Sequence, residues 1–215
     1  MSIVLELQQL AIESNSDVLQ LLRKAYLVAR KLELTEFEAW IDGELNGYKD
    51  NSHIPTYRKL RGELKGLNPM RGWIPVLIPD AEMEEAITTV PVSEPISSLC
   101  DLLRKSHDYV VFPLSGTHCA LISRMVGLNT KFQIYCSSSS LSNIIEQVKT
   151  RILSWALLLE QNGILGTDIS FSAEEKSTAQ STDGIINYIT NFNGPVTNAQ
   201  VQQGTSESKQ SIEIE

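Results

Sequence analysis

The chain has 215 residues, of which 42% are hydrophobic and 20% are charged, as in ordinary globular proteins. Its formal net charge of -8 argues against a protein that coats DNA or RNA, because neutralising phosphates requires clustered Lys and Arg. The three cysteines lack CxxC spacing, so we expect reduced thiols and neither a disulfide framework nor a zinc site. Because we find neither a signal-peptide pattern nor an apolar run long enough for a bilayer, we expect a cytoplasmic protein without a membrane span.

The first fifty residues have the periodicity of helices. Apolar residues within 5–11 predict a short first helix, and apolar residues spaced by three and four across 18–32 predict an amphipathic second one. Thr35, with Glu38 three residues later, matches a capping box and predicts the start of a third helix. The pair Asn46-Gly47 favours its end, because both residues tolerate the left-handed conformation. We therefore expect a compact helical unit at the N-terminus.

The period changes between residues 57 and 91. The run 73–79 is apolar but contains two prolines, which remove ladder donors and favour edge strands or extended loops. Further along the chain we expect a helix opened by Glu94-Pro95 and extending to Leu103, a strand at 109–114, a short helix or turn at 119–125, a strand at 131–136 and a long helix at about 141–161.

The composition changes again after residue 165. Residues 166–182 are mostly polar, as expected for a linker, and residues 183–215 are β-prone and rich in Asn, Gln, Thr and Gly. Exposed strand edges pair readily with copies of themselves, so we expect self-association through this tail, although a disordered C-terminus is the alternative. The tail residues expected at the contact are Ile189, Phe192, Val196 and Val201.

These elements predict the α+β class and a domain over residues 1–165. We expect an N-terminal helical bundle packed on a small mixed or antiparallel sheet, then a long C-terminal helix and finally the β-prone tail.

The most distinctive stretch is WIDGELNGYKDNSHIPTYR, residues 40–58. With the preceding LLRKA at 21–25, it resembles the AbiTii domain of bacterial abortive-infection proteins, and residues 66–165 resemble the less specific remainder of that domain. The resemblance implies a role in defence against bacteriophage, without implying any catalytic residue. The residues that carry it most specifically after the LLRKA run are Trp40, Glu44, Asn46, Gly47, Tyr48, Pro55 and Tyr57.

Two interpretations of this motif are open. Aromatic residues beside an arginine and a carboxylate are typical of binding hot spots, so the cluster is one candidate recognition surface. The favoured interpretation is structural: Trp40 would be part of the core, and Arg58 would reach back to Glu44 or Asp42 to fix the corner after the helix.

Arg58, Arg61 and Arg71, together with Lys59 and Lys65, form a basic run in an otherwise acidic chain. This run is a candidate phosphate or nucleotide site. The alternative is the solvated face of a strand, because the basic residues alternate with others and Glu63 interrupts them.

His118 and Cys119 are adjacent, and a thiol with an imidazole is a hydrolytic pair. However, neighbours in sequence rarely face each other in the required geometry, so we expect no catalytic role for them. No metal or cofactor is expected.

We therefore expect an antiphage protein that acts by self-assembly and protein interaction. Its expected partners are copies of itself and a phage or host protein; nucleic acid is not expected. One alternative is a nuclease or nucleotide-processing effector that uses the basic run at 58–71. Another is a sensor or binding module that regulates a partner effector.

Overall fold

The computed structural model describes residues 2–13 and 16–190. The helices of this part are α1 (Ile3–Ile12), α2 (Val18–Leu32), α3 (Thr35–Asn46), the short 3-10 turns η1 (Asn51–His53) and η2 (Thr56–Arg58), α4 (Ala81–Thr88), α5 (Ile96–Lys105), α6 (Gly116–Val126), α7 (Ser138–Gln161), α8 (Ala173–Ser181) and α9 (Asp183–Thr190). The strands are β1 (Lys59–Arg61), β2 (Glu63–Asn68), β3 (Gly72–Pro75), β4 (Thr89–Pro91), β5 (Tyr109–Pro113) and β6 (Phe132–Ser137).

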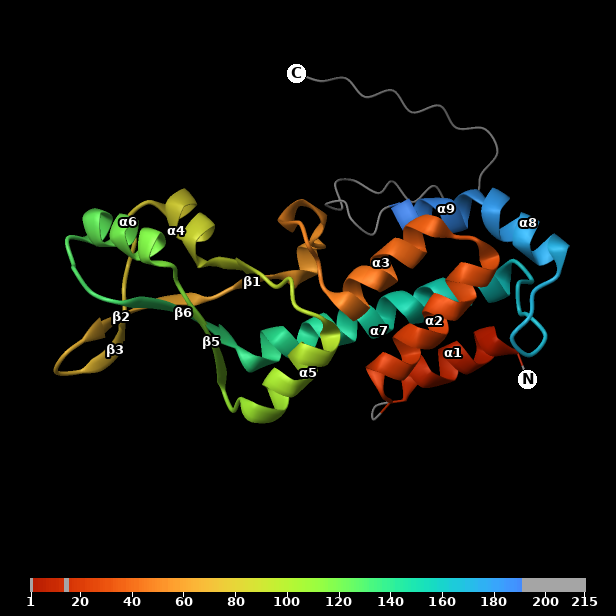
Figure 1. The fold of residues 1–215 in the computed structure, drawn as a ribbon, viewed down its shortest axis with the longest axis horizontal. Coiled ribbons are helices and arrows are strands. Elements are labelled where there is room, and N and C mark those ends of the chain that lie inside the picture. Colours follow the sequence, from red (N-terminus) through yellow and green to blue (C-terminus); the bar gives the residue numbers. More distant parts are fainter. Residues whose placement is uncertain (1, 14–15, 191–215) are drawn as a thin grey trace, which may run out of the picture.

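Two parts are visible in Figure 1: a helical body and an arm built from strands with α4 and α6. The body gathers α1, α2, α3 and α5 around the long helix α7. Its core is aromatic where α3 meets α7, because the ring of Phe37 lies 4.1 Å from that of Trp155 and 5.1 Å from that of Trp40. The apolar stripe of α7 is buried against these helices, which explains why a helix this long is stable.

The arm contains a four-stranded antiparallel sheet in the order β3-β2-β6-β5 and a two-stranded sheet, β1-β4. In the larger sheet Leu64 pairs with Ile134, and Phe112 pairs with Ile134 from the other side. Strand β6 runs directly into α7, whose first turn is capped by the side chain of Ser137. The sheet is therefore continuous with the body through one strand and one helix.

The α+β class is confirmed, as are the helices predicted at 18–32, 96–103 and 141–161. The capping box predicted at Thr35 is wrong, because Leu34 precedes the helix and makes no side-chain cap. Glu38 instead accepts hydrogen bonds from Tyr26 and Arg30 of α2. Helix α4 was not predicted from the sequence pattern.

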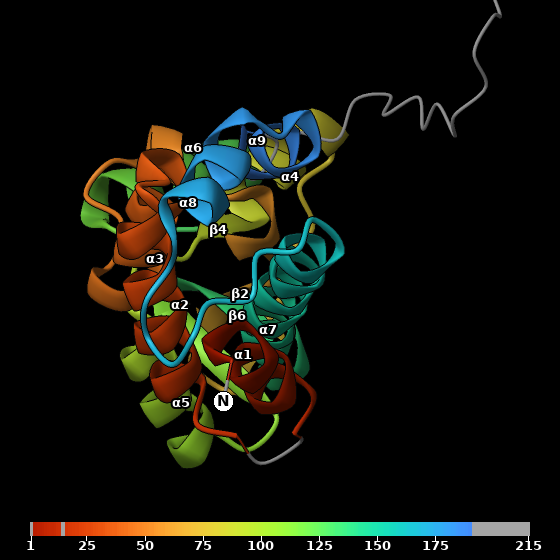
Figure 2. The ribbon, with the colours of Figure 1, turned by 90° about the vertical axis from the view of Figure 1, so that its right-hand side faces the viewer.

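The segment expected to be a linker contains α8, which has a capping box between Ser172 and Glu175. Figure 2 shows α8 beside α2, and the Gln180 side chain donates to the carbonyl of Leu32 there. Residues 183–190 form the helix α9. The strand expected from their composition is therefore wrong for this segment.

Of the residues expected at a self-association contact, Ile189 belongs to the backbone of α9. Phe192, Val196 and Val201 lie outside the described residues. Across residues 2–13 and 16–190, we find no helix with both the length and the apolar character that crossing a bilayer requires.

Candidate functional site

The distinctive motif forms an ion pair in the interior. Glu44 on α3 and Arg58 at the end of η2 both have fully buried side chains. Arg58 Nε donates to Glu44 Oε1 over 2.9 Å, and Nη2 donates to Oε2 over 2.6 Å. This is the two-pronged geometry that suits a guanidinium and a carboxylate. The contact is the one that the structural interpretation of the motif predicts, with Glu44 and not Asp42 as the partner.

Two tyrosines complete the coordination of the carboxylate. The hydroxyls of Tyr48 and Tyr57 donate to Glu44 Oε1 over 2.7 and 2.6 Å, and Trp40 Nε1 donates to the Tyr57 oxygen over 2.9 Å. Burial and the negative charge of Glu44 raise the pKa of both tyrosines well above the ordinary value. Both hydroxyls therefore stay protonated as donors.

The remaining donors of Arg58 reach main-chain carbonyls on the far side of the pair. Nη1 donates to Val92 over 3.0 Å and to Glu94 over 2.8 Å, just before α5 begins. Burial alone lowers the pKa of Arg58, but the hydrogen bonds and charge of Glu44 outweigh this effect and raise it. The network thus ties α3, η2 and the start of α5 together.

Gly47 and Pro55 complete the corner. Gly47 has φ +85°, and a Cβ there would lie 2.8 Å from the carbonyl oxygen of Ser93, so glycine is required. The next amide, of Tyr48, donates to that same oxygen. Pro55 is buried, whereas Asn46 is exposed and its side chain donates to Asp42.

The basic run is not assembled into one site. Arg58 lies in the interior, so the expected surface cluster loses this member. Arg61 is exposed and lies 3.7 and 3.6 Å from the carboxylates of Glu84 and Glu85. Arg71 is exposed at the turn between β2 and β3.

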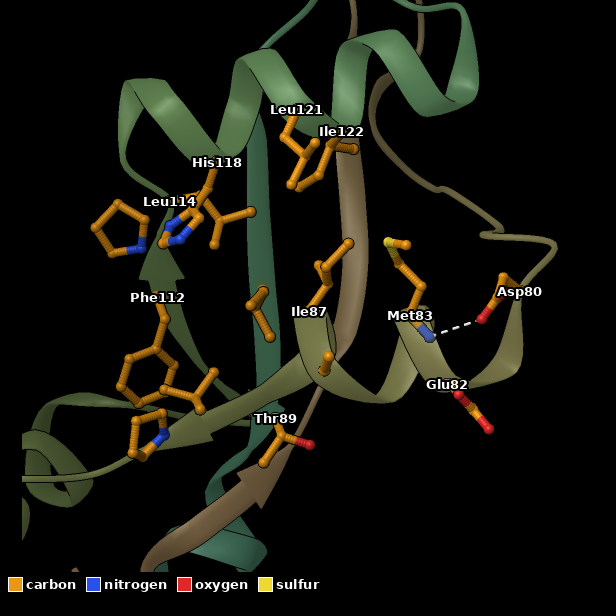
Figure 3. A pocket seen from close by; sticks show the side chains of 15 residues that line it. Asp80, Glu82, Met83, Ile87, Thr89, Phe112, Leu114, His118, Leu121 and Ile122 are labelled. Atoms are coloured by element: carbon orange, nitrogen blue, oxygen red, sulfur yellow. Dashed lines mark hydrogen bonds between the residues drawn. The ribbon is translucent and has the colours of Figure 1, made fainter. Parts of the chain in front are cut away.

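The arm contains an apolar cavity of about 590 Å³ between α4, α6 and the sheet. Figure 3 shows Leu121 and Ile122 entering it from α6, Met83 and Ile87 from α4, and Phe112 from β5. Its volume and apolar character are those of binding pockets. Its full lining is Asp80, Glu82, Met83, Ala86, Ile87, Thr89, Val90, Pro91, Phe112, Pro113, Leu114, His118, Leu121, Ile122 and Ile134.

This cavity is open to solvent at the two helices. Leu121 is 49% exposed and Met83 is 41% exposed, although both line the cavity. Two short helices cover only part of a sheet face that Phe112 and Ile134 make apolar. The arm therefore offers apolar surface that its own residues leave partly uncovered.

Polar groups lie at the rim of the cavity. Asp80 caps α4 by accepting the amide of Met83, as the dashed line in Figure 3 marks, and Glu82 follows it in the first turn. His118 Nδ1 lies 3.1 Å from the hydroxyl of Ser115.

His118 and Cys119 are not assembled for nucleophilic chemistry. The Cys119 thiol is directed to the carbonyl oxygens of Leu114 and Phe132, whereas His118 lines the cavity. Among the described residues no group of three or more His, Cys, Asp or Glu side chains is placed to hold a metal ion.

The structure thus defines an α+β protein with an internal ion-pair network and a sheet arm that carries an apolar cavity. The family model for AbiTii matches residues 2–184, and the chain belongs to the AbiTii family. Membership implies a role in abortive infection, a bacterial defence against phages. No curated protein and no solved structure matches the chain.

Proposed function

We propose that the protein acts in abortive infection through contacts with other proteins and not through catalysis. The observation that carries this proposal is the partly uncovered apolar cavity of the arm, with Leu121 and Met83 exposed at its mouth. A concave site lined by apolar residues can accommodate an anchoring side chain of a partner protein. The most specific motif of the family, in contrast, is occupied by internal contacts.

The charge at the mouth of the cavity defines the chemistry of the partner. Asp80 before helix α4 and Glu82 in its first turn both line the cavity, so the mouth is acidic on this side. The expected ligand is a protein segment that presents an apolar side chain to the cavity and a basic residue to α4.

Assembly of copies is the second part of the proposal. Residues 191–215, which include Phe192, Val196 and Val201, are the segment proposed to join copies, because their composition favours strand pairing. They follow α9, which is anchored to the body by the hydroxyl of Tyr188 donating to the carbonyl of Arg151. The mass of the full chain and of a chain ending at residue 190, measured by light scattering, tests this part. An unchanged number of subunits would contradict it.

Substitution of one exposed leucine tests the cavity. Leu121→Asp places a charge at the mouth and is expected to restore phage plating to the level of cells without the protein. Leu157→Asp is the matched control, because Leu157 is also partly exposed (41%) on a helix, α7 of the body, and is not part of the cavity lining. It is expected to leave protection intact. Full protection by a folded Leu121→Asp variant, with folding verified by circular dichroism, would contradict the proposal.

A further inference from the structure

The four-stranded sheet has a second face that α4 and α6 do not cover. Side chains alternate along a strand, so the neighbours of the cavity residues Phe112 and Ile134 point to the opposite side. In Figure 1 both helices of the arm, α4 and α6, lie on one side of the sheet. Tyr109 and Val111 on this outer face are 54% and 40% exposed.

Three aromatic rings form a row across this outer face. The ring of Tyr135 on β6 lies 6.3 Å from Tyr109 on β5 and 6.3 Å from Trp73 on β3. The ammonium of Lys65 on β2 lies 4.6 Å from the centre of the Tyr135 ring and 5.4 Å from that of Tyr109. A row of rings that surrounds a cation on an open sheet is a platform for stacking planar groups.

The strands β1 to β3 are more basic than the chain as a whole. Residues 59–75, which form β1 to β3, carry four basic residues and one acidic residue, whereas the formal net charge of the chain is -8. Within this window Lys65 lies against two rings of the aromatic row and supplies the positive charge that a phosphate of a polynucleotide requires.

We infer that the outer face binds single-stranded RNA, with bases stacked on Tyr109, Tyr135 and Trp73 and with Lys65 near a phosphate. Open antiparallel sheets bind unpaired RNA in this way, because unstacked bases lie flat on exposed aromatic side chains. Gln133 lies two residues before Tyr135 on β6, and therefore on the same face, where its side-chain amide is available to the 2′-hydroxyls. This binding lies on the opposite face from the cavity and is independent of the function proposed for it.

The ion pair between Glu63 and Lys65 allows a specific test of the inference. Its carboxylate lies 3.0 Å from the Lys65 ammonium and competes with a phosphate for that charge. Glu63→Gln removes the competitor without changing the size of the side chain, so RNA binding becomes tighter. A purely structural role for this ion pair would not produce that gain.

The test measures the fluorescence anisotropy of a labelled single-stranded RNA of about 12 nucleotides, titrated with the full-length chain at low and at higher salt. Tyr109→Ala is expected to weaken binding about tenfold. Glu63→Gln is expected to strengthen it about threefold, as when a surface ion pair no longer competes. Glu33→Gln is the matched control, because Glu33 pairs with Lys176 on the body at 3.2 Å, and it leaves binding unchanged.

Tryptophan emission gives a second measurement on the same samples. Trp40 and Trp155 are buried, so quenching of the emission by stacked bases reports on Trp73 and disappears in Trp73→Phe.

Each of the following results would overturn the inference. They are the absence of RNA binding by the unmodified chain, wild-type affinity in both Tyr109→Ala and Glu63→Gln, quenching that persists in Trp73→Phe, and tighter binding of DNA or duplex of the same sequence. A change in subunit number in Tyr109→Ala, without a change in RNA affinity, would also overturn it and assign the face to contact between copies.

Discussion

The carboxylate of Glu44 and the guanidinium of Arg58 form two hydrogen bonds at a place where neither side chain is exposed. Removing two charges from water is costly, and the pair is tolerated because further hydrogen bonds reach both the carboxylate and the guanidinium. Tyr48 and Tyr57 supply the donors to the carboxylate, and main-chain carbonyls before α5 accept from the guanidinium. Trp40, Glu44, Tyr48, Tyr57 and Arg58 of the distinctive stretch thus form one network.

Removing one member of this pair leaves the other as an uncompensated buried charge. Arg58→Met is therefore expected to lower the free energy of unfolding by about 3–5 kcal/mol. The control is Arg104→Met, because Arg104 pairs with Asp101 at the surface, where the loss is expected to stay below about 1 kcal/mol. Urea denaturation of both variants measures the difference. Equal losses would show that the buried pair has no special role.

Alkaline pH tests the same network through its tyrosines. Burial and Glu44 raise the pKa of Tyr48 and Tyr57 in the folded state, so the unfolded chain ionises first. The stabilisation is complete below the unfolded pKa of about 10 and is lost as pH rises toward the folded values. Unfolding free energies measured across this range are expected to fall more steeply for the wild type than for a Tyr48→Phe, Tyr57→Phe double variant. Parallel pH profiles would contradict this assignment.

Local signals were sufficient for most of the helices and for the ion pair. The periodic stripe of 18–32 corresponds to α2, whose seven buried residues all belong to that stripe. The contact between Arg58 and Glu44 was also foreseeable, because a helix end at Gly47 and a change of chain direction near Pro55, where the structure has the turn η2, return the chain toward α3. Both features depend on residues close in sequence.

Features set by distant contacts were not predictable. Residues 183–190 favour a strand by composition, yet Ile185 is buried and Tyr188 bonds to α7, and this docking stabilises a helix. The cavity requires α4, which has a weak apolar pattern, to meet a sheet formed by strands far apart in sequence. The outer aromatic row likewise emerges only from the register that places Val111 opposite Tyr135.

Gly62 joins β1 to β2 where the chain passes from one sheet to the other, and the space beside it is full. A Cβ at this position would lie 2.4 Å from Ile134 Cγ2 and 2.8 Å from Cys136 Sγ. Gly62→Ala is therefore expected to destabilise the protein by about 1–3 kcal/mol, as overpacked cores do. Gly116→Ala is the control, because nothing lies within 4 Å of its Cβ position at the start of α6. Thermal unfolding measures both variants, and a lower melting temperature for Gly116→Ala than for Gly62→Ala would contradict this prediction.

Glu175 holds the loop that connects α7 to α8. Its carboxylate accepts the amides of Leu165, Gly166 and Ser172 over 3.1, 2.8 and 2.8 Å. Burial raises the pKa of Glu175, but these hydrogen bonds outweigh burial and lower it overall. A depressed folded pKa gives a stabilisation that is present above the unfolded pKa of about 4.3 and is lost as pH falls through the folded value.

Acidification is therefore expected to release this loop before the core unfolds, and amide hydrogen exchange at Leu165 and Gly166 measures the release. Glu175→Gln is expected to produce fast exchange at neutral pH, because a neutral amide is a weaker acceptor for three donors than a carboxylate. Glu174→Gln changes the same charge on the exposed neighbour and leaves exchange slow. If both variants exchanged at the wild-type rate, the carboxylate would not be what fastens the loop, and the lowered pKa would have no structural consequence.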